Sequence, residues 1–146
     1  KIMSAIALRP ALPADEPALV ALDVLATSEP QRIGEIQYWL SQGWVYVAEC
    51  DDAVVGYGVL HNHFYGRSFL ELVMVASPHR RKGIGSVLVR HALQICQSTE
   101  LWSSTNQSNH AMQGLLGRLG FVRSGVIENL DPDDPELIYR AVRPRD

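Results

Sequence analysis

The chain has 146 residues, of which nearly half are apolar and a fifth are charged, and its formal net charge is −3. This composition excludes a disordered or fibrous protein, and the negative charge argues against broad nucleic-acid binding. The length suits one domain with one sizeable core, over residues 3–144. No apolar run approaches the roughly 20 residues that span a bilayer, and no secretory signal is recognisable. We therefore expect a cytoplasmic protein.

The first half of the chain predicts a strand, two helices and three strands. A strand at 5–9 precedes a helix that starts at the acidic, proline-containing segment 15–17, and a second helix runs from Pro30 to near Gly43. Strands at 44–50 and 53–61 are joined by an Asp-Asp turn, and a turn at 62–66 leads into an apolar strand at 69–75.

The second half predicts a helix, a strand, a helix and two strands. Apolar residues recur with helical spacing over 84–97, a short strand follows at 101–105, and a last helix ends at Gly120. Strands at 121–130 and 137–142 flank a proline-containing turn at 131–135. The order predicts one mixed α/β domain, with a parallel element where a strand leads through a helix to another strand.

The most informative segment is the basic, glycine-containing turn between the strand at 69–75 and the helix at 84–97. Its residues are Arg80-Arg81-Lys82-Gly83-Ile84-Gly85. The N–H groups at a helix start lack intrahelical partners, and the helix dipole adds positive charge, so this end attracts anions. Glycines let a phosphate approach the backbone. The turn predicts a pyrophosphate site, against the alternative of a solvated basic loop.

Two other phosphate motifs fit poorly. The Walker pattern requires Gly-Lys-Ser/Thr, which is absent. The dinucleotide fingerprint requires a third glycine where Leu88 stands, and an acidic residue after the next strand. ATP and NAD are therefore not expected.

The chain resembles the GCN5-related N-acetyltransferase (GNAT) family. Its signature Arg/Gln-x-x-Gly-x-Gly/Ala is met at residues 80–85, and Asn109-His110-Ala111 through Leu119-Gly120-Phe121 is similar to a second family motif. The predicted element order also agrees. The resemblance implies a GNAT-like acyl-CoA N-acyltransferase fold, with a single mixed, mostly antiparallel central sheet flanked by helices. A parallel strand pair is splayed at the cofactor site in this fold.

The resemblance implies that acetyl-coenzyme A is the cosubstrate and that no metal is needed. The pyrophosphate would lie on the turn, and the pantetheine arm would lie along the preceding strand as an added strand. A backbone N–H of that strand could stabilise the developing oxyanion. Asn109 would contact the pantetheine, cap the last helix, or do both. The implied contacts are Val73, Met74, Val75, Arg80, Arg81, Lys82, Gly83, Ile84, Gly85, Ser86 and Asn109.

Glu71 is the candidate catalytic residue, since an attacking amine must lose a proton to a base. It interrupts an apolar strand, where desolvation would disfavour its charged form. The alternative is an exposed glutamate on a solvated strand face. His61 and His63 could also act as bases, or could be loop histidines without a catalytic role. His91 is expected to pack against the sheet.

Leu116 departs from the family pattern, which places there a tyrosine that protonates the leaving thiolate. Tyr57, Ser104, Ser108 and Tyr139 are possible substitutes, and water is another. Covalent catalysis is less favoured, because Cys50 and Cys96 are both expected to be buried, and neither belongs to a recognisable Cys-His-acid order.

The expected function is transfer of an acetyl group from acetyl-coenzyme A to a primary amine by direct transfer in a ternary complex. The acceptor could be a small amine or a protein N-terminus. Acidic residues around the last hairpin suggest a cationic acceptor, or form a solvated turn: Glu128, Asp131, Asp133, Asp134 and Glu136. Leu116 keeps open a second function, a non-catalytic acetyl-coenzyme A sensor or partner module. Family members often dimerise, which leaves a homodimer open; neither a nucleic acid nor a membrane is expected as a partner.

Overall fold

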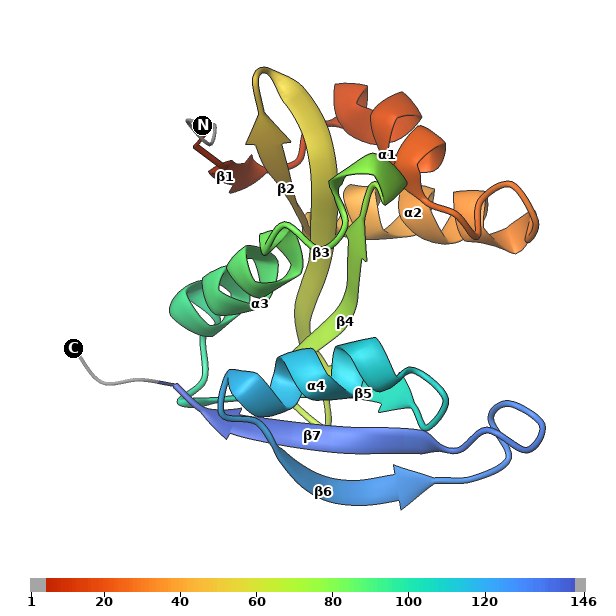
Figure 1. Cartoon of the computed structure of the whole chain (residues 1–146), viewed down its shortest axis with the longest axis vertical. Coiled ribbons are helices and arrows are strands. Elements are labelled where there is room, and N and C mark those ends of the chain that lie inside the picture. Colours follow the sequence, from red (N-terminus) through yellow and green to blue (C-terminus); the bar gives the residue numbers. More distant parts are fainter. Residues whose placement is uncertain (1–4, 144–146) are drawn as a thin grey trace. The chain divides into compact units, whose positions relative to one another are not determined.

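The computed structural model describes residues 5–143, so residues 3, 4 and 144 of the predicted domain lie outside the described residues. Figure 1 shows its helices and strands. The helical segments are η1 (Pro13–Asp15), α1 (Glu16–Leu22), α2 (Gln31–Gln42), η2 (Ser77–His79), α3 (Ile84–Ile95) and α4 (His110–Arg118). The strands are β1 (Ala7–Pro10), β2 (Val45–Cys50), β3 (Ala53–Phe64), β4 (Arg67–Val75), β5 (Glu100–Asn106), β6 (Val122–Ile127) and β7 (Glu136–Val142).

The strands described within residues 5–143 form one mixed sheet in the order β1-β2-β3-β4-β5-β7-β6. β4 and β5 pair in parallel through Phe69↔Trp102 and Leu70↔Ser103. The β1–β2, β2–β3, β5–β7 and β6–β7 pairs are antiparallel. A mostly antiparallel sheet with one parallel pair, flanked by helices, confirms the predicted fold class. No helix in the described part of the chain is long and apolar enough to cross a membrane.

The chain divides into two compact units. The first comprises the residues up to Leu60 together with Leu72–Leu88, and the second comprises His61–Glu71 together with the residues from Val89 onward. The division falls within β3, β4 and α3, which contribute residues to both units.

The core of the first unit lies between α1, α2 and one face of its strands. Leu19 and Ile36 are fully buried against strand residues such as Val47 and Val59, while Leu72 and Met74 pack against the same cluster from β4. Because side chains of a strand alternate between its faces, only alternate residues of β4 reach this core. Gly43, with φ of 75°, ends α2 as the sequence predicts.

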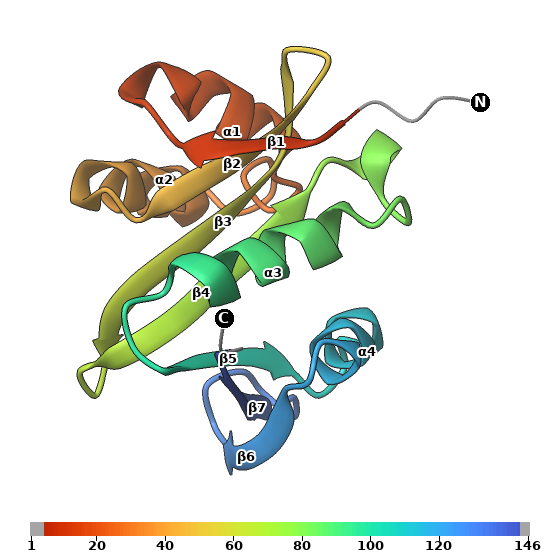
Figure 2. The same cartoon turned by 90° about the vertical axis from the view of Figure 1, so that its left-hand side faces the viewer.

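The other face of the first unit's strands carries the start of α3 (Figure 2). A Cβ at Gly56 would lie 3.1 Å from a Leu88 methyl and 2.9 Å from the carbonyl oxygen of Met74, so only glycine permits this close packing. The Tyr46 hydroxyl donates to the Leu88 carbonyl oxygen at 2.5 Å. These contacts hold the first turns of α3 in place, directly after the basic turn.

The second unit contains β5, β6, β7 and α4, together with the tip of the β3–β4 hairpin. β5 and β7 pair along their whole lengths, from Glu100↔Val142 to Asn106↔Glu136. α4 is tied to the end of β5 by Gln113, whose side-chain amide donates to the Asn106 and Gln107 carbonyl oxygens.

The β3–β4 turn differs from the prediction at 62–66. β3 continues to Phe64, and only Tyr65 and Gly66 form the turn, with φ of 51° and 77°. Two consecutive residues with positive φ match the right-handed twist of the strands that they join. The polar residues Asn62 and His63 favoured a turn by composition, but strand pairing overrides that preference.

Candidate active site

The basic turn joins β4 to α3 through η2. Arg81 and Gly83 have positive φ, 63° and 83°, and α3 begins at Ile84. The Val87 N–H donates to the Gly83 carbonyl oxygen at 3.1 Å, which closes the first turn of the helix. The chain therefore enters α3 through a left-handed glycine, as the sequence suggested for a close anion approach.

The surface of this turn has the character of an anion site. Arg80, Arg81, Lys82 and Gly83 are exposed, and a Cβ built at Gly83 meets no protein atom within 4 Å. The glycine is thus required by its backbone conformation and not by packing within the chain. Three cations beside the start of a twelve-residue helix fit a pyrophosphate.

The end of β4 continues beyond the strand's pairing with β5. That pairing joins Phe69 to Trp102 and Leu70 to Ser103, in the first half of β4. Val73, Met74 and Val75, the predicted pantetheine contacts, come after it and are half-buried.

Glu71 lies next to His61 in the second unit. The His61 Nε2 is 3.0 Å from Glu71 Oε1, and the backbone N–H of His63 donates to His61 Nδ1 at 3.0 Å. Since Nδ1 accepts a hydrogen bond, the neutral ring carries its proton on Nε2 and donates it to the carboxylate. The structure thus joins two candidates that the sequence treated separately.

The expectation that Glu71 is desolvated is wrong. Its side chain is 43% exposed, whereas the side chain of His61 is 8% exposed. The carboxylate is therefore open to solvent and held from one side by a buried imidazole. No sequence signal indicated this pair, because the turn expected at 62–66 placed His61 at a strand end and His63 in a loop.

Asn109 caps α4, as one of its two predicted roles required. Its side-chain Oδ1 accepts a hydrogen bond from the Met112 N–H at 3.1 Å. A contact with pantetheine stays a prediction.

Leu116 is fully buried, and three of the four candidate proton donors already donate to carboxylates. Ser104 Oγ donates to Glu136 Oε2 and Ser108 Oγ to Asp134 Oδ2, each at 2.6 Å. Tyr57 donates to Asp23, and Tyr139 is 5% exposed. These arrangements leave water as the simplest proton source for a leaving thiolate.

The acidic segment before β7 has a structural role. Asp134 accepts hydrogen bonds from the Ser108 N–H and hydroxyl, and Asp131 accepts one from the Asn106 side chain. These bonds fasten the segment to the end of β5 and the start of α4.

The cysteines and His91 contribute little to the candidate chemistry. Cys96 is buried, which raises the pKa of its thiol, whereas Cys50 is half-buried, contrary to prediction. His91 is also half-buried, and burial lowers the pKa of its imidazole. Within residues 5–143, no three His, Cys, Asp or Glu side chains gather as a metal site would require.

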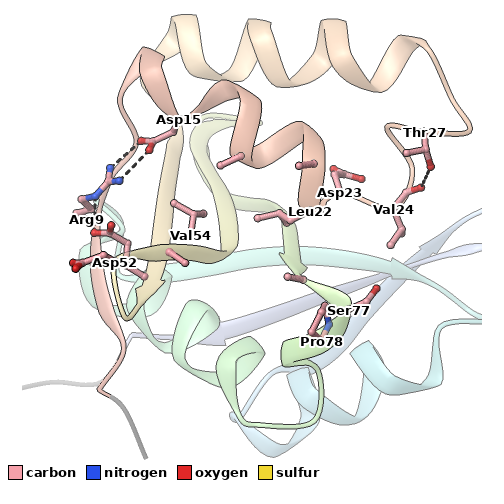
Figure 3. Close-up of a pocket in the computed structure, with 15 residues that line it drawn as sticks. Arg9, Asp15, Leu22, Asp23, Val24, Thr27, Asp52, Val54, Ser77 and Pro78 are labelled. Atoms are coloured by element: carbon pink, nitrogen blue, oxygen red, sulfur yellow. Dashed lines mark hydrogen bonds and ion pairs between the residues drawn. The ribbon is translucent and has the colours of Figure 1, made fainter.

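A pocket of about 800 Å³ opens in the first unit, and Figure 3 shows its lining. Arg9 pairs there with Asp15 and Glu49, each at 2.8 Å. The Arg9 hydrogen bond lowers the pKa of Asp15. None of the residues predicted to bind the cofactor or to catalyse lines this pocket.

Comparison with known proteins identifies the family. The sequence profile of the acetyltransferase (GNAT) family matches residues 15–121. The chain is 30% identical over 106 residues to N-alpha-acetyltransferase 30 from Xenopus laevis, an alignment that covers 66% of this chain and 38% of that protein. The chain thus spans well under half the length of this relative. It belongs to the GNAT acetyltransferase family.

Two solved structures share the fold. A GNAT-family acetyltransferase from Bacillus cereus is 30% identical, with a TM-score of 0.89, and the match covers 97% of this chain and 99% of that chain. A putative acetyltransferase from Salmonella typhimurium, solved with its cofactor acetyl-CoA, is 19% identical, with a TM-score of 0.74 over 97% of this chain and 96% of that chain.

Proposed function

We propose that this protein transfers the acetyl group of acetyl-coenzyme A to a primary amine, by direct transfer in a ternary complex. Family membership supports the reaction class, and the exposed basic turn before α3 supports the cofactor. The observation that carries the chemistry is the exposed Glu71 carboxylate held by the buried His61 imidazole at 3.0 Å.

The cofactor supplies an activated acetyl thioester. The residues of the turn, Arg80 to Ser86, bind its pyrophosphate through backbone N–H groups and the three cations. The backbone of Val73 to Val75 aligns the pantetheine arm and offers an N–H to the thioester carbonyl oxygen. Asn109 adds a contact to the arm from the start of α4.

Glu71 accepts the proton that the amine must lose. The amine nitrogen attacks the carbonyl carbon, the C–N bond forms, and the C–S bond breaks as the electron pair leaves with sulfur. The amine proton passes to the Glu71 carboxylate, directly or through one water molecule. The thiolate takes a proton from water, because Leu116 offers none. His61 orients the carboxylate by donating from Nε2.

The acceptor belongs to one of two chemical classes, a small amine or a peptide N-terminus. The name of the Xenopus relative favours an α-amino group. A panel of both classes, with detection of the free thiol of coenzyme A, measures the activity directly.

The Glu71→Gln variant tests the mechanism. We expect kcat to fall about 100-fold or more, the range for loss of a general base, while the Kd for acetyl-coenzyme A changes less than threefold. Glu35→Gln is a matched control, since the Glu35 side chain is 48% exposed and its carboxylate is paired with Arg32 Nε at 3.0 Å. An unchanged kcat for Glu71→Gln between pH 6 and pH 9 would remove Glu71 from the mechanism.

A non-catalytic acetyl-coenzyme A sensor is the second candidate function. The burial of Leu116, and the carboxylate partners of Tyr57, Ser104 and Ser108, favour it. Tight acetyl-coenzyme A binding without thiol release across the whole amine panel would support the sensor and contradict the transferase.

A further inference from the structure

A row of aromatic rings leads away from Glu71 in the second unit. The His61 ring lies 5.7 Å from Phe69, Phe69 is stacked with Phe64 at 4.6 Å, and Phe64 lies 5.6 Å from Trp102. His63 and Tyr65 flank the row, at 5.8 Å from His61 and 5.1 Å from Phe64. We call these six residues the aromatic patch.

Some rings of the aromatic patch are buried, and others are accessible to solvent. His61 and Phe69 are 8% and 7% exposed, whereas Tyr65 is 82% exposed. Phe64 and Trp102 are half-buried, and His63 is exposed. At one end of the row, the Glu71 carboxylate adds a negative charge beside the rings. The patch therefore offers ring surface and a carboxylate to the same small ligand.

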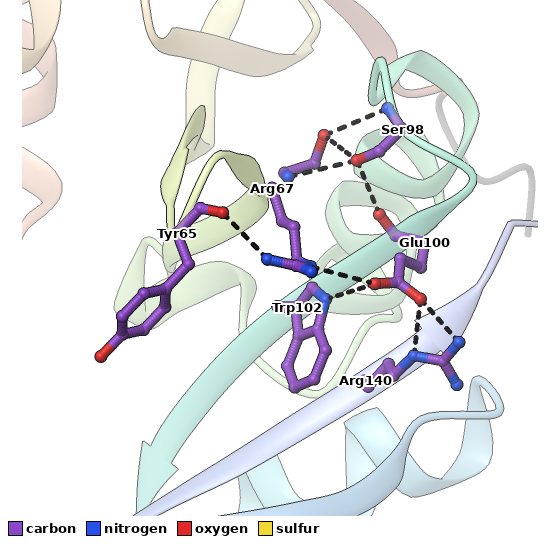
Figure 4. A network of polar contacts seen from close by, with 7 residues as sticks. Tyr65, Arg67, Ser98, Glu100, Trp102 and Arg140 are labelled. Carbon is purple, nitrogen blue, oxygen red and sulfur yellow. Dashed lines mark hydrogen bonds and ion pairs between the residues drawn. The ribbon is translucent and has the colours of Figure 1, made fainter.

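The opposite end of the aromatic patch carries cations (Figure 4). Glu100 accepts hydrogen bonds from the Trp102 indole N–H at 3.0 Å and from Arg140 at 2.7 Å, and Arg67 is 3.7 Å away. These hydrogen bonds lower the pKa of Glu100. Arg67 also donates to the Tyr65 carbonyl oxygen at 2.9 Å. Two guanidinium groups share one carboxylate, so this end has a net positive charge.

We propose that the aromatic patch binds the body of the acceptor, and that the acceptor is a small primary monoamine with an aromatic group. This inference rests on the proposed acetyl transfer. The amine lies at Glu71, and the aromatic group lies on Phe64 and its neighbours, where ring pairs add to burial of apolar area.

Charge selects a monoamine over a polyamine. A polyamine would place a second cation towards Arg67 and Arg140, where like charges repel. Glu71 alone would accept either.

The test compares kcat/KM for 2-phenylethylamine, n-butylamine, spermidine and a peptide with N-terminal phenylalanine. We expect 2-phenylethylamine to exceed n-butylamine about tenfold and to exceed the other two. Phe64→Leu keeps an apolar side chain but removes the ring. It should bring the ratio of kcat/KM for 2-phenylethylamine to kcat/KM for n-butylamine to within about twofold of one. Arg67→Gln should raise kcat/KM for spermidine.

Tyr38→Leu is the matched control, because Tyr38 is an exposed aromatic residue of α2 in ring contact with Trp44 at 5.6 Å. It should leave every ratio unchanged. Preference for spermidine or the peptide, or a ratio unaffected by Phe64→Leu, would overturn the proposal. The proposal would also be overturned if Phe64→Leu changed the oligomeric state but not the preference among the amines. That result would assign the patch to a contact between copies of the chain.

Calorimetric titration of 2-phenylethylamine in the presence of coenzyme A separates this inference from the proposed function. If no amine is acetylated but 2-phenylethylamine binds, and Phe64→Leu weakens that binding at least fivefold, the site stands and the transferase falls. If amines are acetylated without regard to their aromatic group, the transferase stands and the aromatic site falls. If 2-phenylethylamine is neither bound nor acetylated, the proposed aromatic site is overturned.

Discussion

The Tyr57→Phe substitution probes a buried polar network that holds the end of α1 in the first unit. Tyr57 is fully buried and donates its hydroxyl hydrogen to Asp23, which is 1% exposed. Asp23 also accepts hydrogen bonds from Arg32 at 3.1 Å and from the Leu25 N–H at 2.9 Å. The phenylalanine removes one donor and changes little volume, so the loss isolates that hydrogen bond.

The expected cost follows from the charge on the acceptor. A hydrogen bond to a charged group contributes about 1.5–3 kcal/mol, against about 1 kcal/mol between neutral groups. We therefore expect Tyr57→Phe to lower the free energy of unfolding by about 2 kcal/mol. The matched control is Tyr46→Phe, since the Tyr46 hydroxyl is also buried but donates to the neutral Leu88 carbonyl, and should cost about 1 kcal/mol.

Urea unfolding at pH 7, followed by circular dichroism, measures both losses. Burial, with the neighbouring Asp23 charge, raises the pKa of Tyr57. The stability that Tyr57 contributes is therefore complete below its unfolded pKa of about 10 and is lost as the pH rises above that value. If Tyr57→Phe costs no more than Tyr46→Phe at pH 7, the network does not stabilise the fold as argued.

Three further substitutions test other parts of the structure. Gly34→Ala should raise the unfolding free energy by about 0.5–1 kcal/mol, because Gly34 lies within α2 and a Cβ there meets only open space; a loss in urea unfolding would contradict this. Gly83→Ala, at φ of 83°, should weaken coenzyme A binding about fivefold by titration calorimetry, and unchanged affinity would refute the role of this backbone conformation. Arg9 lowers the pKa of Asp15, so the stability from this pair is present above about pH 4 and lost as the pH falls. The Tm gap between wild type and Asp15→Asn should shrink between pH 7 and pH 3, and a constant gap would count against the pair.

Local sequence predicted most of the elements, because their signals lie within a few residues. Gly43 ends α2 and Asn109 caps α4, as residue type alone suggested. The Asp-Asp turn between β2 and β3 has φ values of 52° and 65°, which suit a tight hairpin. The turn after β3 was misplaced, since the polar residues Asn62 and His63 belong to a strand that pairing extends.

The basic turn before α3, for which we propose anion binding, is determined by local sequence for the same reason. Arg80, Arg81, Lys82 and Gly83 are consecutive, and the start of a helix creates its own N–H donors and dipole wherever it lies. The family resemblance also rests on such contiguous motifs, so the fold and family followed from the sequence.

Only the tertiary structure decided which side chains meet. His61 and Glu71 are ten residues apart on two strands, and a one-residue change in register would turn either away from the other. Burial of Leu116 and exposure of Glu71 likewise depend on what packs around them. The sequence determined that this protein presents a basic, glycine-containing turn before a helix, whereas the fold decided which carboxylate, imidazole and aromatic rings stand together.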